Sequence, residues 1–176
     1  LGQTKRMALK RFANIRSNGL IAINLKERDE LVSVKIAHSD DDVIIISKNG
    51  QGIRFPVAQM MQRSRTASTT RGIRLVNNDT VISMDIAVDE AHILTLSEQG
   101  FGKLTPVSSY PVHNRGGQGV RAFRITDKTG PLAAAEIVSN TNELIVGSAK
   151  AMVIRVALSE IPSLGRQTSG VMVMRK

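Results

Sequence analysis

Arginine recurs in four polar stretches of the chain that also carry glycine, serine, threonine or asparagine. Guanidinium groups, hydroxyls and backbone N–H groups bind phosphate oxygens, and glycine lets a backbone approach a ligand closely. One such stretch alone is usually a solvated connection. Its recurrence favours a periodic stripe of phosphate-binding groups instead. The stretches are residues 11–18, 62–71, 113–118 and 165–169.

Residue types that support catalysis or metal binding do not converge. The chain has no cysteine, which excludes disulfides, thiolate metal sites and a cysteine nucleophile. His38, His92 and His113 lie about half a repeat or a whole repeat apart and have no neighbouring ligands. The run of aspartates at 40–42 falls in an expected connection between strands. We therefore predict no catalytic site, no metal site and no cofactor in this chain.

The charge balance points to an anionic partner. Twenty-four Lys and Arg residues against fifteen Asp and Glu residues give a formal charge of +9, with a sequence pI near 10.5. A strong positive balance is typical of nucleic-acid binding. No apolar run approaches the roughly 20 residues that span a bilayer, and no signal-type segment follows Leu1. We expect a cytoplasmic protein with no membrane and no small-molecule partner.

A strand pair with a tight turn repeats along the chain. It occurs at residues 43–55, 92–104 and 144–155, and residues 2–7 match the second half of a fourth copy. The apolar runs are short, rich in Val and Ile, and interrupted by Asn-Gly or Gln-Gly, as β-hairpins require. The turn positions, spaced by 48, 50 and 50 residues, are Gly2, Gly50, Gly100 and Lys150.

Two further markers recur in the same register. A glycine opens a β-rich segment at Gly19, Gly72, Gly119 and Gly170, with intervals of 53, 47 and 51 residues. Between the markers lie further strand candidates, at 31–37, 81–88 and 132–138. Four short strands in about fifty residues are typical of a propeller-like array of blades.

The predicted fold is therefore all-β, with four-stranded blades in a single repeat domain over residues 1–176. Three full blades lie between two partial ones. The predicted repeats are residues 1–18 (partial), 19–71, 72–118, 119–169 and 170–176 (partial).

Four segments carry a resemblance that covers essentially the whole chain, namely residues 70–75, 97–103, 114–120 and 165–171. The chain resembles the C-terminal domain of the A subunit of bacterial type IIA topoisomerases, and that of gyrase in particular. The resemblance implies a β-pinwheel, a propeller-like fold whose neighbouring blades exchange a strand. It also implies that duplex DNA wraps around a basic outer rim and that this wrapping supports supercoiling. DNA cleavage and ATP hydrolysis, with ATP and Mg²⁺, would lie elsewhere in the complex. The implied partners, besides DNA in the bacterial nucleoid, are the gyrase B subunit plus the rest of the gyrase A subunit.

One segment departs from the family pattern. Gyrase carries a box of the form Gln-Arg-Arg-Gly-Gly-Lys-Gly, and its nearest match, residues 113–119, keeps one Arg and all three Gly but has Gln118 in place of Lys. An intact box is expected upstream of Leu1. Topoisomerase IV is accordingly the first alternative, and a propeller-like scaffold that binds an acidic protein is the second. Tyr110, the only tyrosine, does not match the DNA-cleaving tyrosine of the family and is interpreted as a packing or rim residue.

The candidate contacts are to phosphates rather than to bases. Aromatic residues make up 3% of the chain and tryptophan is absent, so platforms for base stacking are scarce. Arginines that follow a curved rim would favour a bent duplex without reading its sequence. The predicted DNA-binding residues are Arg11, Arg16, Arg63, Arg65, Arg71, Arg74, Lys103, Arg115, Gly116, Gly117, Arg121, Arg124 and Arg166.

Overall fold

The computed structural model describes residues 1–15, 17–138 and 143–175, and these form strands and short 3₁₀ turns without an α-helix. The strands are β1 (Gln3–Thr4), β2 (Asp42–Ser47), β3 (Gln51–Pro56), β4 (Thr70–Arg71), β5 (Val81–Ala87), β6 (His92–Ser97), β7 (Phe101–Pro106), β8 (Val120–Arg121), β9 (Leu132–Val138), β10 (Glu143–Gly147), β11 (Val153–Ala157) and β12 (Val171–Met172). The 3₁₀ turns are η1 (Leu9–Phe12), η2 (Val57–Gln59), η3 (Val107–Ser109) and η4 (Leu158–Glu160). The all-β prediction is confirmed.

The three predicted hairpins are β2–β3, β6–β7 and β10–β11, and all three pair antiparallel. Each turn is closed in the same way. The hydroxyl of Ser47 accepts a hydrogen bond from the Gln51 backbone N–H at 3.1 Å, and Ser97 and Ser148 do the same for the residues four places later. The residue at the left-handed position of the third turn is Ala151 (φ 61°). Ala151, and not Lys150 as predicted, is thus equivalent to Gly50 and Gly100.

The blades exchange strands. Two four-stranded sheets have the order β5-β2-β3-β8 and β9-β6-β7-β12, with every neighbouring pair antiparallel. The inner edge strands, β5 and β9, come after the hairpins with which they pair and before the next hairpin. The outermost strands, β8 and β12, come only after the next hairpin in the chain. This exchange confirms the pinwheel. It also explains why three hairpins give two four-stranded sheets: β10–β11 and β1–β4 form two-stranded sheets within the described residues.

The exchanged strands correct the predicted register. Arg71 pairs with Gln3, Arg121 with Gln51 and Met172 with Phe101, so these three partners of the hairpin strands are equivalent. Gly119 and Gly170 precede their strands by one residue, and the matching residue in the earlier repeat is Thr69 rather than Gly72. The uneven intervals of the glycine marker came from that misalignment of three positions.

Two predicted strands are absent in the first repeat. Residues 19–23 and 31–37 have no assigned strand, although β5 and β9, which are equivalent to 31–37, pair with β2 and β6. No described strand offers a backbone ladder to 31–37. Alternate side chains of 31–37 still contact β5: the Ser33 hydroxyl donates to the Met84 carbonyl at 3.0 Å, and Lys35 forms an ion pair with Asp85.

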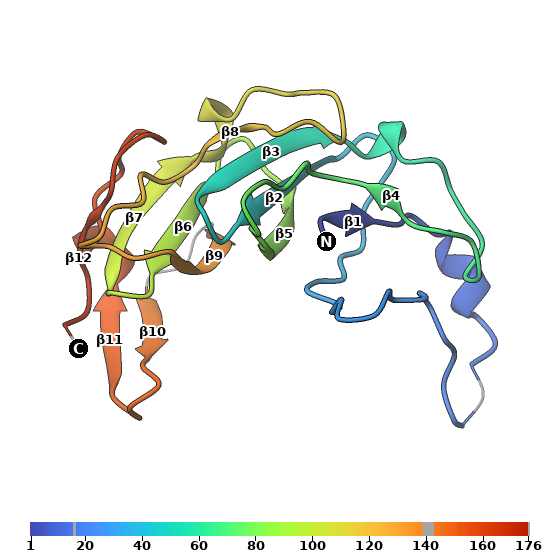
Figure 1. Ribbon diagram of the computed structural model, residues 1–176, viewed down its shortest axis with the longest axis horizontal. Helices are drawn as coiled ribbons and strands as arrows, with labels where there is room; N and C mark the ends of the chain where they lie inside the picture. The colour runs from blue at the N-terminus through green and yellow to red at the C-terminus, as the bar shows by residue number, and fades with distance from the viewer. Residues whose placement is uncertain (16, 139–142, 176) are drawn as a thin grey trace.

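The blades stack face to face, so the β2–β3 hairpin is buried on both sides, whereas β10–β11 is largely exposed. Ile44 and Ile46 of β2 pack in one cluster with Phe123, while Val43 and Ile45, the alternate residues, pack in another with Phe55. A strand covered on both faces requires a continuous apolar run, which is what residues 43–46 provide. Figure 1 shows the stacked blades along an arc, with β5 and β9 toward its concave side and the connections that follow β3 and β7 over its convex side.

Glycine at the hairpin turn is required by the exchanged segment. Gly100 has φ +81°, and a Cβ there would lie 1.9 Å from the Met174 carbonyl oxygen. We expect Gly100→Ala to lower the free energy of unfolding by roughly 2–3 kcal/mol, because the segment at 173–174 must move away. Ala151→Gly at the equivalent turn should change it by less than roughly 1 kcal/mol. Urea unfolding measures both, and equal losses would contradict this explanation.

Candidate nucleic-acid interface

The outermost strands of the blades carry exposed arginines at equivalent positions. Arg71 ends β4 and Arg121 ends β8, while Arg74 and Arg124 follow each of them by three residues, and all four side chains are exposed. Every ion pair found among the described residues uses other cations. The charges of these four residues, here called the rim arginines, are therefore available to an external anion.

A second set of arginines lies half-buried in the loops beside the rim. The guanidinium of Arg166 donates through Nε to the Ser109 carbonyl at 2.8 Å and through Nη1 to the Arg121 carbonyl at 3.0 Å. Arg115 binds the equivalent carbonyls of Gln59 and Arg71. Arg65 donates to the Ile21 carbonyl at 2.9 Å. We call Arg65, Arg115 and Arg166 the clamp arginines. Their hydrogen bonds hold backbone, so they differ in role from the rim arginines.

Lys103 does not belong to the rim. Its side chain is fully buried, and its Nζ donates to the Gly165 and Arg166 carbonyls, both at 2.7 Å, and to the Thr168 hydroxyl at 3.3 Å. It also lies 5.4 Å from the centre of the Phe123 ring. Burial, together with the neighbouring charge of Arg166, lowers the pKa of Lys103 to about 8. The prediction that Lys103 contacts DNA is not supported, because the residue points inward beneath the loop at 165–168.

The remaining predicted residues are scattered in role. Arg11 is exposed in η1, whereas Arg63 is half-buried. Arg16 lies outside the described residues. The N–H of Gly116 donates to the Gly72 carbonyl at 2.8 Å, and the carbonyl of Gly117 accepts from the Arg74 N–H at 2.8 Å. The backbone of these two glycines thus joins neighbouring repeats. The Gly116 N–H, which the glycine-rich pattern predicted as a donor to phosphate, is already hydrogen-bonded within the chain.

Two cationic residues were missed by the sequence reasoning. Arg175 is exposed and equivalent to Arg74 and Arg124, because Met174, Phe123 and Ile73 each donate a backbone hydrogen bond to a turn glycine at 3.2 Å. The spacing of 51 residues from Arg124 could have identified it. Lys5 is the counterpart of Lys103, since its Nζ donates to the Arg65 carbonyl. Only the corrected register reveals that pairing.

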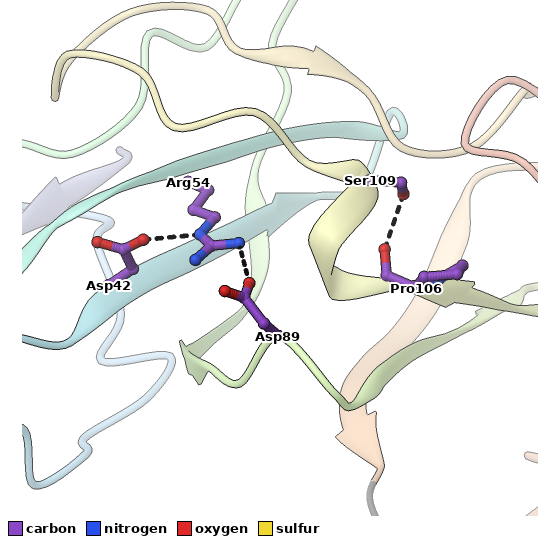
Figure 2. Close-up of polar contacts among 5 residues, drawn as sticks. All are labelled: Asp42, Arg54, Asp89, Pro106 and Ser109. Atoms are coloured by element: carbon purple, nitrogen blue, oxygen red, sulfur yellow. Dashed lines mark hydrogen bonds and ion pairs between the residues drawn. The ribbon is translucent and has the colours of Figure 1, made fainter.

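Some arginines near the rim already have anionic partners. Arg54 in β3 donates to Asp42 at 2.8 Å and to Asp89 at 2.6 Å (Figure 2). Arg155 in β11 is paired with Glu143 in the same way. Position alone therefore does not mark a binding residue, and the lack of an acidic partner among the described residues separates the rim arginines from Arg54.

Other kinds of site find little support in the described part of the chain. No helix there is long and apolar enough to cross a membrane. No group of three or more His, Cys, Asp or Glu residues in residues 1–15, 17–138 and 143–175 is arranged to hold a metal ion. Tyr110 is buried in the core, which confirms its interpretation as a packing residue.

Comparison with known families is decisive. The family described as the DNA gyrase C-terminal domain, β-propeller, matches residues 1–38, 41–87, 91–139 and 142–176. The chain belongs to this family. Each matched segment after the first begins one residue before the first strand of a hairpin, at β2, β6 and β10. The match to the gyrase domain thus follows the same repeat that the sequence shows.

Individual relatives of this gyrase domain agree with the family assignment. The DNA gyrase A subunit of Halalkalibacterium halodurans is 54% identical over 174 residues, and that of Streptococcus pneumoniae is 52% identical over 174 residues. In both, the alignment covers 99% of this chain and 21% of the relative, so the chain spans about a fifth of their length.

Solved structures of related domains share the fold. The C-terminal domain of a DNA topoisomerase IV superimposes with a TM-score of 0.91 at 19% identity, covering 99% of this chain and 55% of that one. A DNA gyrase A C-terminal domain gives 0.88 at 24% identity, with coverages of 99% and 59%. At these identities the likeness establishes the β-pinwheel architecture.

The buried Lys103 predicts a pH dependence of stability. Below about pH 8 the lysine holds its proton in both states, whereas between about 8 and 10.5 the unfolded chain holds it and the folded chain does not. The free energy of unfolding should therefore gain a rising contribution from this group across that window. Lys103→Met removes the contribution. Urea unfolding of both proteins at several pH values tests this, and parallel curves from pH 8 to 10.5 would contradict it.

Proposed function

We propose that this chain binds duplex DNA without sequence specificity and wraps it along the outer edge of its blades. The observation that carries the proposal is the set of rim arginines: exposed, without an intramolecular anion among the described residues, and repeated on successive outermost strands. Cations repeated along a surface neutralise successive phosphates, which is the main source of affinity that does not depend on sequence.

The shape of the domain supports wrapping. The outermost strands lie along an arc, and a duplex that follows their arginines must bend (Figure 1). Bending costs elastic energy that additional phosphate contacts offset. Base reading is disfavoured because Tyr110 and three of the four phenylalanines, Phe55, Phe101 and Phe123, are buried.

We assign this function to the A subunit of gyrase rather than to topoisomerase IV. The relatives that share about half of their aligned residues with the chain are named as gyrase A subunits, with 54% and 52% identity. The topoisomerase IV domain shares 19% and supports the fold alone. In the proposed assembly, the B subunit, together with the remainder of the A subunit, supplies DNA cleavage and ATP hydrolysis with Mg²⁺, in the bacterial cytoplasm.

Salt dependence tests phosphate binding. The logarithm of duplex affinity should fall linearly with the logarithm of salt concentration, by about 0.9 per neutralised phosphate. The double variant Arg71→Gln/Arg121→Gln should reduce the slope by about 1.8. The control Lys35→Gln/Lys48→Gln removes the same charge from residues that are already paired with Asp85 and Glu98. Equal slopes for the two variants, or a flat titration of the wild-type protein, would exclude the proposal.

Wrapping predicts a preference for flexible DNA. A duplex with a central single-strand nick bends at a lower cost than an intact duplex of the same length. We expect tighter binding to the nicked duplex when the DNA is long enough to contact two blades, and equal binding when it is shorter. Fluorescence anisotropy with matched pairs of duplexes measures this difference. Equal affinities at all lengths would indicate straight binding, without wrapping.

A further inference from the structure

The rim arginines are not independent of the repeat that follows them. The carbonyl of Arg121 accepts a hydrogen bond from Arg166, and the carbonyl of Arg71 accepts one from Arg115. With repeats counted from hairpin to hairpin, as residues 41–87, 91–139 and 142–176, the clamp arginine belongs in both cases to the next repeat along the chain. The side chains of Arg115 and Arg166 therefore hold the backbones of two rim arginines, Arg71 and Arg121 respectively.

Backbone hydrogen bonds between the same segments reinforce this contact. The Arg124 N–H donates to the Thr168 carbonyl at 3.0 Å, and the Arg124 carbonyl accepts from the Ser169 hydroxyl at 2.8 Å. One repeat earlier, the Arg74 N–H donates to the Gly117 carbonyl at 2.8 Å. The loop of one repeat is thus the support beneath the rim arginines of the preceding repeat.

The clamp is anchored on fixed groups. Ser109, whose carbonyl accepts from Arg166, donates its hydroxyl to the Pro106 carbonyl at 2.7 Å (Figure 2). The Arg166 guanidinium also lies 5.8 Å from the centre of the Tyr110 ring, which is buried. Two carbonyls and a ring face fix the guanidinium plane, so its orientation is determined by the core of the neighbouring blade.

We propose that Arg115 and Arg166 are positioning residues for DNA binding, each holding the rim arginine of the preceding repeat, Arg71 and Arg121 respectively, where it meets a phosphate. This inference rests on the proposed function. It assigns the two sets of cations different roles: the rim arginines contact DNA, and the clamp arginines act through them. A planar guanidinium suits two carbonyls at once, whereas a lysine ammonium keeps the charge and cannot reproduce both bonds.

The first repeat provides a natural control. Arg65 makes the same kind of bond, but its acceptor is the carbonyl of Ile21, which occupies the position of Arg71 and Arg121. Because Ile21 carries no charge, Arg65 has no rim arginine to position. Arg65→Lys should therefore report the structural cost of losing a clamp without the loss of a DNA contact.

The test is a set of double-mutant cycles on the whole chain with an intact duplex. Arg166→Lys should weaken binding about fivefold and lower the salt slope by about 0.9, although the net charge is unchanged. Combined with Arg121→Gln, Arg166→Lys should cost less than about twofold more, whereas with Arg71→Gln the full fivefold loss should persist. Arg65→Lys should leave both affinity and slope at wild-type values.

The outcomes separate this inference from the proposed function. Equal losses from Arg166→Lys in the Arg121→Gln and Arg71→Gln backgrounds, or an equal loss from Arg65→Lys, would overturn the positioning role. An Arg121→Gln protein that binds with wild-type affinity and slope would overturn the proposed function itself. If Arg166→Lys does not fold, as judged by circular dichroism, Arg115→Lys against Arg71→Gln gives the same cycle one repeat earlier.

Discussion

The outermost hydrogen-bond ladder of every complete blade is supplied by a strand from the following repeat. β8 pairs with β3 and β12 pairs with β7, each through only two residues in register. A short strand cannot hold itself in place, and its position depends on what lies on either side of it. On one side is the hairpin turn, where Gly100 gives room for the Met174 carbonyl. On the other side is the loop of the next repeat, such as residues 165–169 beside β8, where a clamp arginine binds the strand's backbone.

This arrangement separates cations that look alike in the sequence. Arg121 and Arg166 both lie in polar segments of the same repeat pattern, yet Arg121 is exposed and Arg166 is half-buried with two carbonyl partners. Arg54 does not join the rim arginines, because the carboxylates of Asp42 and Asp89 already pair with its guanidinium. We therefore propose that the basic rim has two layers: exposed arginines that contact an external anion, and half-buried arginines that hold the backbone beneath them.

The sequence predicts the fold well because residues that favour tight turns recur with the period of the blades. Asn-Gly and Gln-Gly turns between short apolar runs identified two hairpins, and the spacing of about fifty residues identified the third, at 144–155. The family resemblance supplied the strand exchange. The errors arose where a position is defined by its partner. Gly72 resembles the marker glycines, but strand pairing makes Thr69 their equivalent. Likewise, Lys150 fits the spacing of the turn residues, but Ala151 has the left-handed backbone.

The candidate site was predicted less completely, for the same reason. Burial of Lys103 depends on a loop about sixty residues later that folds over it, and nothing near Lys103 in the chain signals that. The availability of Arg71 and Arg121 depends on the lack of a carboxylate partner in the part of the chain that the structure describes, which is a property of the three-dimensional neighbourhood. Strand pairing shows that Arg71 and Arg121 are equivalent, and the repeat period applied from Arg124 would have found Arg175, 51 residues later.

Strand exchange also constrains how such a domain can change length during evolution. Removing only a hairpin, such as β6–β7, would leave β9 and β12 without the strands on which they lie. Removing a full period of about fifty residues leaves the next inner and outer strands to take over the vacated pairings, since the repeats are equivalent in register. Gains and losses are therefore expected in whole periods, and related domains should differ in blade number more readily than in blade construction.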